Sequence, residues 1–186
     1  MKIKTMFLLA ALVASGSLHA ESVEIPVLYR NPAQKVKTGD LLAFGFYENE
    51  TRIVLAFQIK NLQEFMKQPK AVMSFYADTD NDLTTGRFPN THGWDFQINV
   101  LLNRKTISSM LKWNGNEAEY INIRGKYTLS ADGDMLYITF PKSIIAGVEF
   151  KQQFRIRTLD LTANKRVDQQ KPFGVFPEKF NLPEDK

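Results

Sequence analysis

Three aspartates at alternate positions form the segment of this sequence with the clearest chemical potential. Asp78, Asp80 and Asp82 follow a run of apolar residues, and Gly86 comes shortly after them. They therefore fall where a strand is expected to end and the chain to turn. In a turn, side chains at this spacing can point at one centre, and clustered carboxylates are the hard oxygen ligands that Ca²⁺ prefers. Without a cation their charges would repel one another, so the segment is predicted to bind calcium.

The segment does not fit the EF-hand loop, and a solvated acidic turn is the simpler alternative. An EF-hand requires glycine at its sixth position and glutamate at its twelfth, where this sequence has Leu83 and Pro89. Calcium is favoured because strongly patterned segments hold the loop at both ends. In addition, Asp95 opens the next segment, where it can return a fourth carboxylate. The predicted ligands of a structural Ca²⁺ are Asp78, Asp80, Asp82 and Asp95.

The acidic segment and the residues after it resemble a known motif. Residues 76–82 read Tyr-Ala-Asp-Thr-Asp-Asn-Asp, and Thr85-Gly86 and then Gly93-Trp94-Asp95 follow. This arrangement is similar to that of secreted bacterial β-sandwich modules related to carbohydrate-binding module family 9. There, an acidic hairpin loop and a following G-x-D strand bind structural calcium. The resemblance implies a β-sandwich, calcium at the four aspartates and a carbohydrate ligand, but the family's sugar-clamping aromatic residues cannot be placed here.

The first 20 residues have the pattern of a secretory signal peptide. Lys2 and Lys4 precede an apolar run from Met6 to Ala14, and small residues lead to Ala20. The run is shorter than the roughly 20 residues of a membrane span. We therefore expect cleavage after Ala20, no transmembrane anchor, and export to the bacterial periplasm or the extracellular space. Cleavage would leave 166 residues and reduce the formal charge from +4 to +2, too little to indicate nucleic acid as a partner.

The counts of cysteine and histidine exclude several kinds of catalysis. The 186-residue chain has no cysteine and two histidines, of which only His92 lies beyond the predicted signal peptide. Disulfides, thiol nucleophiles and Cys-ligated metal clusters are excluded, and one histidine cannot build a His-rich zinc site. A Ser–His–Asp triad would have to use this loop histidine, and no G-x-S-x-G motif is present. Because no pair of acidic residues has a spacing suited to a glycosidase, the chain is predicted not to be an enzyme.

Beyond the signal peptide, apolar and polar residues alternate with the period of β-strands. Residues 93–103 show this most clearly, and the alternation of Trp94 with Phe96 and Ile98 predicts that Trp94 is a core residue. Helical signals are confined to residues 61–68, with Asn61 as the expected N-cap, and residues 141–146. The predicted strands are residues 23–29, 40–47, 51–60, 70–78, 93–103, 106–113, 117–124, 135–140 and 150–161.

These patterns predict an all-β fold. We expect an antiparallel β-sandwich or jelly roll of about eight to nine strands with one or two short helical turns. The signal peptide spans residues 1–20, a single β-sandwich domain spans residues 21–172, and a C-terminal extension rich in proline and charge spans residues 173–186.

The favoured function is an exported, non-catalytic, calcium-binding β-sandwich that acts as a carbohydrate-binding-like module. Such a module needs exposed aromatic rings on which sugars can stack, and the candidates are Trp113 and Tyr120. The ligand would be a glycan or polysaccharide. The alternative is a periplasmic interaction or accessory protein in which calcium is purely structural. Its partner would be another periplasmic or cell-surface protein, met by Arg155 and Arg157 or by the C-terminal tail.

Overall fold

The computed structural model describes residues 23–30, 38–80, 82, 84–87, 93–115, 117–145, 148, 153–160, 165–169 and 179–182. The signal peptide predicted for residues 1–20 and the loop residue His92 lie outside these ranges. Within them, every helix is too short or too polar to cross a membrane.

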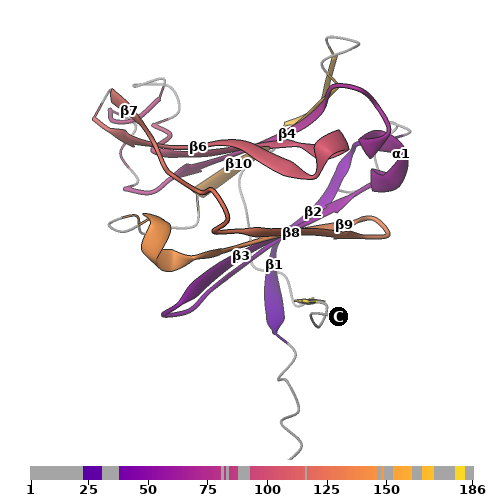
Figure 1. The fold of residues 1–186 in the computed structure, drawn as a ribbon, viewed down its shortest axis with the longest axis horizontal. Helices are drawn as coiled ribbons and strands as arrows, with labels where there is room; N and C mark the ends of the chain where they lie inside the picture. The colour runs from indigo at the N-terminus through magenta and orange to yellow at the C-terminus, as the bar shows by residue number, and fades with distance from the viewer. Residues whose placement is uncertain are drawn as a thin grey trace, which may run out of the picture.

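Two antiparallel sheets of six strands each form the described part of the fold, and they lie as two facing layers (Figure 1). The first sheet has the order β12-β1-β2-β3-β9-β8, and the second has the order β11-β10-β4-β5-β6-β7. The predicted all-β sandwich is confirmed. The strands are β1 (Glu24–Arg30), β2 (Leu41–Glu48), β3 (Arg52–Ile59), β4 (Ala71–Asp78), β5 (Phe96–Leu101), β6 (Thr106–Asn114), β7 (Glu117–Tyr120), β8 (Thr128–Asp132), β9 (Met135–Pro141), β10 (Gln153–Asp160), β11 (Lys165–Gln169) and β12 (Lys179–Asn181).

Three of these strands, β8, β11 and β12, were not predicted from the sequence. Each lies at an edge of its sheet and is short, with five residues in β8 and β11 and three in β12, so that a period of two is hard to distinguish over so few residues. The last of them, β12, belongs to the predicted C-terminal extension and pairs with β1. In contrast, β7 ends at Tyr120, earlier than predicted, although the backbone N–H of Ile121 still donates to the carbonyl oxygen of Met110 in β6 at 2.9 Å.

Two of the three short helices in the described residues lie near the predicted positions, whereas the third, at residues 102–104, begins where a strand was predicted to end. They are α1 (Leu62–Met66), η1 (Leu102–Arg104) and η2 (Lys142–Ile145). Asn61 occupies the N-cap position of α1 in a left-handed conformation, but its side chain makes no capping hydrogen bond. Instead, the backbone N–H of Leu62 donates to Oδ1 of Asp134 at 3.1 Å. The cap is therefore supplied from the turn before β9, which local sequence could not reveal.

The hydrophobic core fills the space between the two sheets. Four phenylalanines from both sheets form its centre, with ring centroids 5.1 Å apart for Phe44 and Phe57, 5.6 Å for Phe44 and Phe75, and 6.5 Å for Phe75 and Phe96. All eight residues of β4 are buried. Because side chains alternate along a strand, the face of β4 opposite Phe75 carries Asp78 at its end, away from the core.

Candidate metal centre

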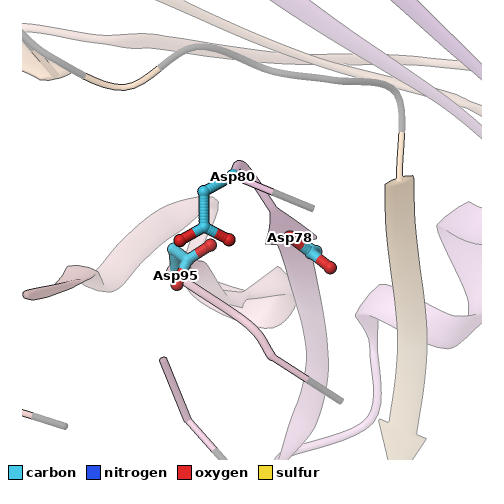
Figure 2. Close-up of side chains that lie close together, drawn as sticks. All are labelled: Asp78, Asp80 and Asp95. Carbon is cyan, nitrogen blue, oxygen red and sulfur yellow. The ribbon is translucent and has the colours of Figure 1, made fainter. Parts of the chain in front are cut away.

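Three aspartates converge where β4 ends and β5 begins (Figure 2). Asp78 is the last residue of β4, Asp80 follows in the turn, and Asp95 immediately precedes β5. Each offers one carboxylate oxygen, and these oxygens all lie within 4.8 Å of one another. Asp78 and Asp95 are only 4% and 7% exposed, while Asp80 is exposed to solvent. Two buried carboxylates and one accessible carboxylate thus share a small volume.

Hydrogen bonds to the end of β4 hold Asp95 in this position. Its backbone N–H donates to the carbonyl oxygen of Ala77 at 3.0 Å. Its Oδ2 atom accepts from the backbone N–H of Thr79 at 3.0 Å and lies 3.3 Å from the hydroxyl of Thr79. The structure therefore brings Asp95 to Asp78 and Asp80, as the sequence predicted.

Asp82, the fourth predicted ligand, does not join this group. Its Oδ1 atom accepts hydrogen bonds from the hydroxyl of Thr84 at 2.7 Å and from the backbone N–H of Thr84 at 2.8 Å. These bonds, the hydroxyl first, lower the pKa of Asp82 below its ordinary value. Asp82 therefore stabilises the turn through local hydrogen bonds. Its position two residues after Asp80 suggested a fourth ligand, but its carboxylate bonds to Thr84 and not to the other aspartates.

The surroundings of the cluster disfavour the charged form of Asp95. Burial raises the pKa of this carboxyl above its ordinary value, and the nearby charge of Asp80 raises it further, against the hydrogen bonds from Thr79 that lower it. Asp78 makes other contacts, but its Oδ2 atom is buried and accepts no hydrogen bond. A cation bound among the three carboxylates would favour their charged forms.

The segment after Asp82 closes the loop tightly against Asp95. Thr85 places its hydroxyl 2.8 Å from Oδ2 of Asp80 and 3.4 Å from Oδ1 of Asp95. Gly86 follows with φ +70°, and a Cβ atom there would lie 2.5 Å from the carbonyl oxygen of Trp94 and 2.6 Å from Oδ1 of Asp95. Only glycine combines this backbone conformation with so close an approach.

Arg87 links the acidic loop to the outer face of the second sheet, a role that sequence reasoning missed. Its backbone N–H donates to the carbonyl oxygen of Trp94 at 2.7 Å, and its Nη1 atom donates to Oε1 of Gln97 at 2.7 Å. The guanidinium carbon lies 5.9 Å from the ring centroid of Tyr76 and 6.0 Å from that of Trp113. In the sequence, the only indication of this role is that a basic residue directly follows the loop glycine, Gly86.

Trp94 is buried as predicted, at 5% exposure, but it belongs to neither hydrophobic cluster of the fold. Its ring stacks on Tyr76 with centroids 4.3 Å apart and an interplanar angle of 29°. The alternation seen in the sequence does not extend to Trp94, because this residue forms only an isolated bridge with Arg87 before β5 begins at Phe96.

The two aromatic residues predicted to bind a ligand lie on β6 and β7. Tyr120 is 76% exposed, and Trp113 is half-buried. Tyr120 pairs with Leu111, and Leu111 is two residues from Trp113. The two aromatic residues therefore share the outer face of the second sheet as diagonal neighbours, which places their Cα atoms about 7–8 Å apart. Arg155 and Arg157 were predicted to contact a protein partner, and their side chains lie outside the described part of the structure.

A chain of polar side chains crosses the same outer face. Arg87 bonds to Gln97, and Nε2 of Gln97 donates to Oδ1 of Asn99 at 2.8 Å. The same Asn99 oxygen accepts from the hydroxyl of Ser74 at 2.7 Å. Nδ2 of Asn99 donates to Oγ of Ser109 at 2.8 Å. These bonds join the loop, β4, β5 and β6 into one ordered polar network beside Trp113.

Comparison with known proteins found no match, whether to a protein-family model, to a curated protein or to a solved structure.

Proposed function

We propose that this protein is an exported, non-catalytic binding module whose β-sandwich holds one Ca²⁺ at Asp78, Asp80 and Asp95. The spacing of the three carboxylate oxygens, all within 4.8 Å of one another, carries the proposal. Oxygens bound to one calcium ion lie about 2.3–2.6 Å from it, so two of them can be at most about 4.6–5.2 Å apart. The remaining ligands of a six- to eight-coordinate ion would be backbone oxygens or water.

The ion would have a structural role. It would join the end of β4 to the start of β5 and would stabilise the closed loop in which Thr85 and Gly86 contact the aspartates. Arg87 follows directly, so calcium would also hold the guanidinium between Tyr76 and Trp113. Because the chain has no cysteine and hence no disulfide, the stability added by a bound ion would be of use to an exported protein.

The ligand that we propose is a carbohydrate polymer bound on the outer face of the second sheet. Aromatic rings beside ordered polar groups suit sugars, which have apolar faces and hydroxyl edges. Trp113 and Tyr120 supply the rings, and Arg87 supplies a half-buried polar group next to Trp113, at one end of the polar network that continues through Gln97 to Asn99.

Calorimetric titration of EDTA-treated, dialysed protein with Ca²⁺ tests the metal site. We expect one ion per chain and loss of binding in Asp80→Asn. If no heat of binding is detected over the millimolar range, the calcium proposal fails.

A polysaccharide pull-down with the calcium-loaded protein tests the ligand separately. We expect retention on at least one glycan polymer, and we expect Trp113→Ala to reduce it by tenfold or more. Retention that is unaffected by both Trp113→Ala and Tyr120→Ala would place the ligand elsewhere. Failure to retain the protein on any polymer would favour the alternative, a protein-interaction role with purely structural calcium.

A further inference from the structure

A second hydrophobic cluster lies on the outer face of the first sheet, away from both the core and the acidic loop. Four of its residues are buried: Ile25, Val54, Ala56 and Tyr137. They come from β1, β3 and β9, which lie in the same sheet. An apolar sheet face of this kind needs a cover, and part of that cover comes from the end of the chain: Phe180 and Leu182 pack against it.

The covering segment, residues 179–182, is added to the sheet as a short edge strand. Three residue pairs join β12 to β1 in antiparallel register, with Phe180 opposite Ile25. The backbone N–H of Leu182 donates to the carbonyl oxygen of Val23 at 3.0 Å. Lys179 forms an ion pair with Glu24. The contacts follow the pattern of strand addition, in which main-chain bonds give affinity and alternate side chains enter pockets.

The ring of Phe180 occupies a space that a glycine makes available. A Cβ atom at Gly45 would lie 2.9 Å from Cδ2 of Phe180 and 3.0 Å from Cγ2 of Ile25. On the same ring, the guanidinium carbon of Arg30 lies 5.7 Å from the centroid. Arg30 is itself oriented by a hydrogen bond from Nη1 to Gln58 at 2.9 Å. Gly45, Ile25 and Arg30 thus define a site for one aromatic side chain.

We propose that this outer face is a strand-addition site for an extended peptide with an aromatic residue at the position of Phe180, and that residues 179–182 are its resident occupant within the chain. The segment is held by three residue pairs at a sheet edge, Lys179 is exposed, and Phe180 and Leu182 are only partly buried. So small an attachment opens at a lower free energy than the core strands. A peptide partner of matching chemistry can then take its place. This site is separate from the proposed calcium site and glycan face.

A labelled peptide with the sequence of residues 177–186 is a direct probe of the site. The tethered segment competes at an effective concentration on the order of millimolar, so the wild-type chain should bind the peptide weakly. Phe180→Ala in the full chain should weaken that competition and increase the peptide affinity at least tenfold in fluorescence anisotropy. The same peptide with alanine at the Phe180 position is the matched control and should not bind. In the Phe180→Ala chain, Gly45→Ala should abolish binding while the variant still melts cooperatively.

An exposed charge swap provides a second test if Phe180→Ala does not fold. Glu24→Lys opposes Lys179 with a like charge, and both side chains are more than half exposed, so the fold should be preserved. This variant should bind a peptide with glutamate at position 179 about twofold to fivefold more tightly than the natural peptide, in line with the modest energy of surface ion pairs. The proposal is overturned if a folded Phe180→Ala chain binds no better than wild type, if the alanine peptide binds equally well, or if Glu24→Lys does not discriminate between the peptides.

Discussion

Replacing Asp80 by asparagine should abolish the stabilisation of the fold by calcium, whereas the same replacement of Asp82 should not. Both side chains are exposed, both lie in one turn, and each change removes one negative charge. Only Asp80 belongs to the carboxylate cluster, since Asp82 accepts its hydrogen bonds from Thr84. The two variants therefore separate coordination of an ion from general attraction between the acidic loop and a cation.

The size of the effect follows from binding linkage. Free Ca²⁺ at 100 times its dissociation constant stabilises the folded state by about 2.7 kcal/mol. For a chain of this length each kcal/mol shifts the melting temperature by roughly 2–4 °C, so wild-type protein should melt about 5–11 °C higher in calcium than in EDTA. Asparagine at position 80 can still accept the 2.8 Å bond from the backbone N–H of Asp82 but weakens the 2.8 Å bond from Thr85. In EDTA this variant should therefore stay within about 1.5 kcal/mol of wild type.

Thermal melts followed by far-ultraviolet circular dichroism, in EDTA and in excess Ca²⁺, measure these shifts. Mg²⁺ at the same concentration controls for ionic strength and should have a smaller effect. If Asp80→Asn keeps the full calcium shift, the three-carboxylate site is wrong. If Asp82→Asn loses the shift, Asp82 coordinates the ion after all, and the turn must rearrange on binding.

Four further predictions can be checked. Burial raises the pKa of Asp95 in the metal-free fold. Ionised Asp95 therefore destabilises the metal-free fold at neutral pH, and this penalty disappears as the pH falls through the raised pKa and the carboxyl is protonated. Asparagine cannot be protonated in this way. In EDTA, wild-type protein should therefore lose less stability on acidification than Asp95→Asn. Protons should compete with Ca²⁺ at a higher pH than for an ordinary aspartate, whose pKa is about 3.9, so the calorimetric affinity should begin to fall at a higher pH than three ordinary aspartates would give. Gly86→Ala should destabilise the fold by more than about 1 kcal/mol and weaken calcium binding, because its Cβ would meet Trp94 and Asp95. Gly115→Ala is the control, since this glycine also has a positive φ but faces open space; it should cost less stability and leave calcium affinity unchanged. Equal losses of stability for the two variants in denaturant titrations would contradict this prediction. Mass spectrometry of the exported protein should find Glu21 as its first residue, and retention of residues 1–20 would contradict the signal-peptide prediction.

The class of fold could be read from the sequence because strand alternation is a local consequence of burial on one face. The central strands β3, β4 and β5 were all predicted because every second residue in each is apolar and faces the core, although β3 and β4 are buried on both faces. The strand predicted for β5 was a few residues too long at each end. The edge strands β8, β11 and β12 are too short for such a pattern to stand out. For Trp94, alternation gave the right burial but the wrong neighbours, since the residue lies before regular pairing begins and stacks on Tyr76 instead.

The sequence by itself determined the β-sandwich, the acidic turn after β4 and the return of Asp95 at the start of the next strand. Only the tertiary structure decided which carboxylates meet. Asp82 is next to the cluster in sequence, yet local hydrogen bonds with Thr84 satisfy it, whereas pairing of β4 with β5 brings Asp95 to Asp78 and Asp80. The same holds for the end of the chain, where Phe180 lies on Gly45 because β12 adds to β1. Spacing in sequence limits which residues can meet locally, but strand pairing brings together residues that are distant in the chain.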